Sequence, residues 1–167
     1  MRGFIVAALA AFALTSAAPA SAAEAPYAKL AKALGTPVLA DSIGPADKSR
    51  LLLKFVPTGQ TATNWKKMTT VSILKVQPAD TASATRGVIA RLQTQLKARH
   101  ATIKTFDRSP LPPLTAYFEF SADGESSSGI VYSPDPGYVT VAQVDTKSGN
   151  PVSSRDVKLL KSIIAPH

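Results

Sequence analysis

Six short segments with strand-like patterning constrain the fold of this chain more than any other feature. They span residues 50–56, 70–77, 101–106, 114–120, 129–133 and 138–144. In the clearest of them, Leu114, Ala116, Phe118 and Phe120 alternate with Thr115, Tyr117 and Glu119. Strict alternation predicts one strand face in the core and one in solvent. We therefore expect Leu114, Phe118 and Phe120 to be buried, and Tyr117 and Glu119 to be much more exposed.

The connections between these segments indicate how the strands pair. Asp123-Gly124 and the Pro134–Gly137 stretch are turn sequences between successive segments. Strands that follow one another through short turns pair antiparallel.

Two amphipathic helices are expected beside the sheet. One is capped by Asp80 or Thr81 and carries an apolar stripe of Val88, Ile89, Leu92 and Leu96. The other has Ser153 as its cap and Asp156 as its capping-box partner, with an apolar side of Val157, Leu160, Ile163 and Ile164. The sequence thus predicts an α+β fold: a mainly antiparallel sheet of five to six strands covered by two helices.

The N-terminus has the pattern of a secretory signal peptide. Arg2 is the only charged residue before Glu24, residues 4–14 are all apolar, and small residues at 20–22 follow Pro19. The apolar run is too short to span a membrane, which needs ~20 residues. We expect cleavage near Ala22 or Ala23, with no transmembrane segment afterwards.

Cleavage would leave about 144 residues, which fit one domain. We expect a signal peptide at 1–23, a peripheral segment at 24–48 with a short helix over 27–34, and one α+β domain at 49–167. The chain contains no cysteine, so its core is built without disulfides. No Asn lies in a glycosylation motif. Together these features favour the bacterial periplasm or exterior.

The net charge of +8 is unevenly distributed. Between Lys48 and Arg108 there are twelve Lys or Arg residues against Asp80 and Asp107, whereas 109–145 contains five acids and no base. Segregation of this kind can create one cationic surface for an anionic partner, or simply a solvated basic face. A shared face is compatible with the pattern but is not required by it.

The sequence contains partial matches to catalytic motifs, but strand geometry or residue spacing excludes each of them. Ser72 and Lys75 match S-x-x-K, but residues three apart on a strand point to opposite faces, so this Lys could not activate this Ser. The Gly124–Gly129 stretch is out of register for a nucleophile elbow. The two histidines, His100 and His167, end a helix and the chain, and no metal-ligand spacing is present. We expect no metal and no cofactor.

Trp65, the only tryptophan, lies between two predicted strands and next to Lys66 and Lys67. An indole beside cations suits stacking on a base or sugar. Alternatively, Trp65 anchors the connection on the core. The strand–PxGQ–x4–W–strand segment, with Pro57, Gly59, Gln60 and Trp65, resembles small exported bacterial proteins of unassigned function. The element order is similar to that of the Mog1/PsbP-like sandwich. These resemblances imply a fold, and no activity or functional residue can be inferred from them.

The sequence therefore predicts an exported, non-enzymatic binding or accessory protein of the bacterial envelope. Its expected partner is an anionic polymer or surface, or another protein; nucleic acid is disfavoured because few aromatic residues lie in the basic half. The candidate binding residues are Trp65, Lys66, Lys67, Arg86, Arg91 and Lys97. The alternative is a small periplasmic hydrolase with a site assembled from scattered residues.

Overall fold

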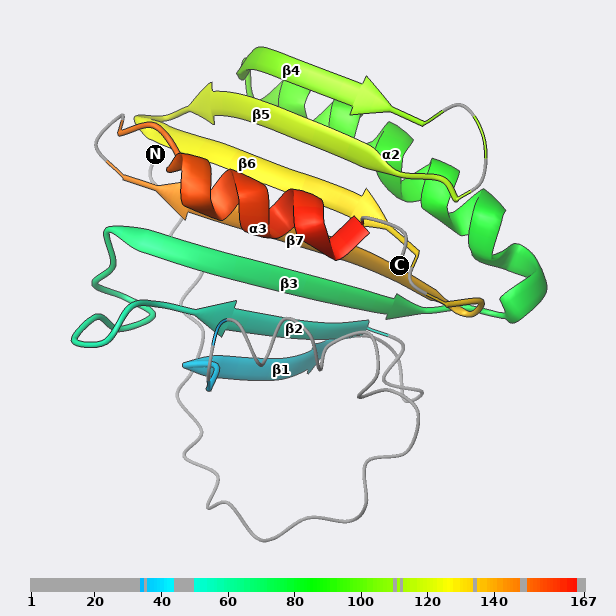
Figure 1. Cartoon of the computed structure of the whole chain (residues 1–167), viewed down its shortest axis with the longest axis horizontal. Coiled ribbons are helices and arrows are strands. Elements are labelled where there is room, and N and C mark those ends of the chain that lie inside the picture. The colour runs from blue at the N-terminus through cyan, green and yellow to red at the C-terminus, as the bar shows by residue number, and fades with distance from the viewer. Residues whose placement is uncertain are drawn as a thin grey trace, which may run out of the picture.

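Figure 1 shows the computed structural model, in which one antiparallel sheet lies between two helices. The structure describes residues 34, 36–43, 50–109, 111, 113–133, 135–147 and 150–164. The predicted signal peptide and nearly all of the predicted helix over 27–34 lie outside these residues.

The described residues form seven strands in the order β1-β2-β3-β7-β6-β5-β4. The strands are β1 (Leu39–Ile43), β2 (Arg50–Phe55), β3 (Lys67–Lys75), β4 (Thr102–Arg108), β5 (Ala116–Ala122), β6 (Glu125–Tyr132) and β7 (Tyr138–Thr146). A short 3-10 helix, η1 (Pro78–Asp80), leads into α2 (Thr81–Ala98), and α3 (Ser154–Ile164) ends the described chain.

The α+β class and the antiparallel sheet are confirmed, but five to six strands was wrong because the sheet has seven in the described part of the chain. The additional strand is β1, which comes from the segment expected to be peripheral. Its sequence, LADSI, is short and has no marked β-branched or alternating pattern. It extends the sheet by antiparallel pairing with β2, from Leu39 opposite Lys54 to Ile43 opposite Arg50.

The chain crosses the sheet once through α2. After β3 it runs through η1 and α2 to β4 at the opposite edge, and then returns by β5, β6 and β7, so that β7 pairs with β3. The β5–β6 turn is Asp123-Gly124, with φ of 54° and 77°. Positive φ at both central residues is the geometry of a type I′ hairpin, and it confirms the turn predicted there.

The sheet has a separate apolar core on each face. On the α2 face, Ile89 and Leu96 of the helix cluster with Phe118, Phe120, Val131 and Val139 of the sheet. On the α3 face, Leu160 clusters with residues that include Val71, Tyr117, Ile130 and Val144. Figure 1 shows α3 in front of the sheet and α2 behind it.

Because both faces are covered, the expectation of an exposed Tyr117 was wrong: its side chain is only 7% exposed. Phe118 and Phe120 are buried as predicted, whereas Leu114 precedes β5 and is half-buried. The α2 face also depends on Gly129, because a Cβ there would collide with the Phe118 ring. A glycine is thus required where that ring crosses β6.

The helix α2 does not cover its whole face of the sheet. The fully buried strand residues of its cluster come from β5, β6 and β7, while Leu52 of β2 and Thr70 and Ser72 of β3 stay half-buried. One helix is about 10–12 Å wide, which is too narrow to shield seven strands that lie about 4.8 Å apart. The uncovered strands beside α2 form the floor of the site described next.

Candidate functional site: a cationic groove beside α2

A groove of about 380 Å³ lies between α2 and strands β2, β3 and β7. Its apolar lining consists of Leu52, Leu74, Val88, Leu92, Val139 and Val141. Sheet register explains the floor, because Leu74 pairs with Val139 and Leu52 is opposite Ser72, which pairs with Val141. Side chains at these positions share one face of the sheet.

The polar lining consists of Arg50, Thr70, Ser72, Arg91, Gln95 and Gln143. Arg50 comes from β2 and Arg91 from α2, so the groove is lined by one arginine of the sheet and one of the helix. Arg50 Nε donates a hydrogen bond to Ser72 Oγ at 2.9 Å, which fixes one side of its guanidinium toward the floor. Its terminal nitrogens remain available to another acceptor.

The two arginines have no carboxylate partner among the described residues. None of the groove-lining residues is Asp or Glu. Asp41 on the edge strand is in register with Leu52 and forms no ion pair with either arginine. The groove is thus cationic, and its charge is not neutralised within the described fold.

The lining also carries no His or Cys, so neither Ser72 nor Thr70 has a neighbouring base that would activate its hydroxyl. Within the described residues, no group of three or more His, Cys, Asp or Glu side chains is placed to hold a metal ion. Chemically, the arrangement can orient an anion by hydrogen bonds and cover an apolar surface.

The structure places three of the predicted binding residues on α2. Arg91 lines the groove, Arg86 lines a second hollow on the other side of the helix together with Arg108, and Lys97 is exposed in the last turn. All three residues therefore belong to α2, but Arg91 alone of them lines the groove.

Trp65 lies in the β2–β3 loop and is partly buried. The ammonium of Lys147 sits over its ring, with Nζ 4.4 Å from the ring centroid. The indole thus already has a cation–π partner within the fold. This contact favours the anchoring interpretation of Trp65.

The loop containing the PxGQ segment is closed by its own residues. Gly59 has a φ of 84°, and the backbone N–H of Gln60 donates to Pro57 O at 3.0 Å. The Gln60 side chain then accepts hydrogen bonds from the backbone N–H groups of Lys66 and Lys67, at 2.6 and 3.4 Å. Lys66 is exposed at its side chain, and its backbone helps to close this loop onto β3.

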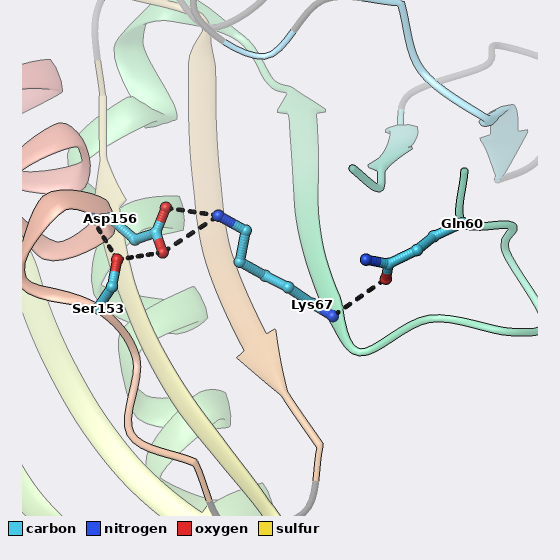
Figure 2. Close-up of polar contacts among 4 residues, drawn as sticks. All are labelled: Gln60, Lys67, Ser153 and Asp156. Carbon is cyan, nitrogen blue, oxygen red and sulfur yellow. Dashed lines mark hydrogen bonds and ion pairs between the residues drawn. The ribbon is translucent and has the colours of Figure 1, made fainter. Parts of the chain in front are cut away.

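Lys67 lies on the opposite face of the sheet from the groove. Its Nζ contacts both carboxylate oxygens of Asp156 in α3, at 3.0 and 3.3 Å. Figure 2 shows this ion pair together with Ser153, whose hydroxyl donates to Asp156 Oδ2 at 2.6 Å and accepts from the Asp156 backbone N–H. Ser153 caps the last helix as predicted, but the Asp156 carboxylate accepts from the Ser153 hydroxyl, and no bond from the Ser153 backbone N–H completes a capping box among the hydrogen bonds of the described residues. Lys67 joins this cap to β3.

A second cation on the α3 face is also engaged within the fold. Lys161 Nζ lies 4.4 Å from the centroid of the Tyr117 ring. The Tyr117 hydroxyl donates to Glu119 Oε1, and burial, reinforced by this hydrogen bond, raises the pKa of Tyr117 to about 12.

Sequence reasoning placed Arg50 in the basic segment but did not assign it to a site, and it did not identify the groove. A signal for it exists: alternation in β2 puts Arg50, Leu52 and Lys54 on one face, next to Thr70 and Ser72 of β3. Such a half-polar sheet surface is not part of either apolar core and can face solvent or a ligand.

No α-helix in the described residues combines the length and apolar character needed to cross a bilayer. In comparisons with known proteins, no protein-family model matches the chain and no curated protein shows significant similarity to it.

Proposed function

We propose that this chain is an exported, non-enzymatic binding protein of the bacterial envelope, and that its partner is an anion held in the groove beside α2. The leader-like N-terminus supports export, and the absence of cysteine favours a bacterial over a eukaryotic secreted protein. The two arginines that line the groove support the binding of an anion.

One observation carries the proposal: Arg50 and Arg91 face one groove from two secondary-structure elements, and neither has a carboxylate partner among the described residues. Guanidinium groups present planar pairs of donors that match carboxylate and phosphate oxygens. Two of them beside a floor that carries hydroxyl and amide groups but no carboxylate would give an anion a strong preference for this place.

The alternative of a small hydrolase has less support. Catalysis of acyl or phosphoryl transfer needs a nucleophile beside a base, or a metal-activated water. In the groove, Ser72 Oγ instead accepts a hydrogen bond from Arg50 Nε. This contact positions the arginine and does not activate the serine.

The test is retention of the purified protein on an immobilised polyanion, eluted with increasing salt. The variant Arg50→Gln/Arg91→Gln removes two charges from the groove. The matched control Arg155→Gln/Lys158→Gln removes two exposed charges from α3 on the opposite face. We expect the groove variant to elute at clearly lower salt than the control, because ionic contacts made at the groove are lost.

Equal elution of the two variants would contradict the proposal, since retention would then depend on net charge and not on the groove. Elution of the unmodified protein without any salt requirement would also contradict it.

A further inference from the structure

We propose that the occupant of the groove is a soluble single-chain amphiphile, with one anionic head group such as a carboxylate or phosphate and one alkyl chain. This inference rests on the proposed function and names the class of ligand. It follows from how charge and apolar surface are arranged around Arg50, Arg91 and the floor.

The head group would lie between the two arginines. Arg50 is held toward the floor by its hydrogen bond to Ser72 Oγ, while Arg91 reaches in from one turn before Gln95 on α2. Hydrogen bonds from guanidinium to an ionised oxygen are about twice as strong as neutral ones.

The floor explains why a purely hydrophilic anion would be a poor fit. Arg50 is in register with Leu74, which is in register with Val139, so one row of apolar side chains follows from the cation across the sheet. The next row places Ser72 between Leu52 and Val141, and Thr70 and Gln143 form a polar pair beyond it. Val88 and Leu92 of α2 continue this surface on the facing wall. Covering apolar surface contributes about 25 cal/mol per Å², and an inorganic anion would forgo that contribution.

The size of the groove limits the occupant further. At about 380 Å³ it is near the lower end of the range for small-molecule sites, roughly 300 to 1,000 Å³. Such a space suits one short chain better than a two-chain lipid or a folded partner. Charge complementarity, apolar surface and volume therefore agree on one class of ligand.

The experiment is calorimetric titration of the purified protein with three probes: octanoate, acetate and 1-octanol. Octanoate carries both head and chain, acetate the head alone, and octanol the chain with a neutral head. We expect octanoate to bind at least tenfold more tightly than either of the others, because only octanoate uses both the arginines and the floor.

Three variants locate the binding. Arg50→Gln/Arg91→Gln should weaken octanoate binding about tenfold or more. Leu52→Asn, on a half-buried floor position, should weaken octanoate binding without changing the response to acetate. Arg86→Gln/Arg108→Gln, which removes two charges from the hollow on the other side of α2, should leave the octanoate affinity within about twofold of the unmodified protein.

Several outcomes would overturn the inference. Equal binding of acetate and octanoate would mean that the head group alone is recognised, and the polyanion result for Arg50 and Arg91 could still stand. Equal losses in the two arginine-pair variants would place the binding outside the groove. Binding to phosphatidylglycerol vesicles without any binding of octanoate would favour a membrane surface as the partner.

Discussion

Lys67 and Arg91 lie on opposite faces of the same sheet and differ in what they contact. Lys67 pairs with Asp156 and ties β3 to α3, and on the same face Lys161 lies over the Tyr117 ring. On the α2 face, Arg91 and Arg50 have no carboxylate partner among the described residues. Lys67 and Lys161 are therefore engaged within the fold on one face, whereas Arg50 and Arg91 on the other face line a groove.

This contrast shows why net charge alone is a weak guide to function. A cation paired at 3.0 Å with a carboxylate that is only 13% exposed contributes little field beyond the pair. A guanidinium that has no carboxylate partner among the described residues keeps its full charge for a ligand. The sequence contains both kinds of residue in the same basic segment, and the sheet separates them.

The largest expected loss of stability comes from removing a side chain that packs α2 against the sheet. Phe118 is fully buried in the α2-face core with Ile89 and Leu96. Phe118→Ala should lower the free energy of unfolding by ~3–5 kcal/mol, measured by urea denaturation. The control Leu111→Ala, at a side chain that is 71% exposed, should change it by less than about 0.5 kcal/mol. A loss below about 1 kcal/mol for Phe118→Ala would contradict the core assignment.

The next prediction concerns the α3 face at alkaline pH. Burial raises the pKa of both Tyr117 and Tyr132 from 10.0 to about 12. Their neutral forms are therefore favoured in the folded state, whereas the unfolded chain ionises near pH 10. The free energy of unfolding should be insensitive to these groups below pH 10 and should fall between about pH 10 and 12.

Urea denaturation at a series of pH values measures this fall. Tyr132→Phe removes one of the two groups, so its stability should fall less steeply across the same range. An identical slope for Tyr132→Phe and the unmodified protein would mean that Tyr132 ionises equally in both states.

Much of the fold can be predicted from the sequence because local patterns agree with it. Three local patterns each specify their own geometry: the Asp123-Gly124 turn, the Ser153 cap of the last helix and the alternation around Phe118. Tyr117 was misjudged because alternation indicates that a strand has two faces, but not whether a second helix covers the polar-looking one. The strand β1 was missed because its pairing with β2 is tertiary and leaves no periodic signal in LADSI.

The groove could be predicted only in part. Arg91 was recognised as a basic residue off the apolar stripe of its helix, and Arg50 as a base on a strand. Their meeting depends on sheet order and on α2 leaving β2 and β3 uncovered. Likewise, the pairing of Lys67 with Asp156 joins residues 89 positions apart in the chain. Neither relation follows from local spacing.

The central claim is that Lys67, paired with Asp156 of α3, stabilises the fold, while Arg91 on the α2 face is available to a partner. It is tested most directly by measuring unfolding free energy and polyanion retention on two single-charge variants, Lys67→Gln and Arg91→Gln. We expect Lys67→Gln to lose about 1 kcal/mol of stability, a modest loss because the ion pair with Asp156 is partly screened by solvent. The salt concentration at which it elutes should change little, because Lys67 is already paired within the fold. Arg91→Gln should stay within about 0.5 kcal/mol of the unmodified protein and elute at lower salt. The reverse pattern, or equal effects of both variants on both measurements, would contradict the account.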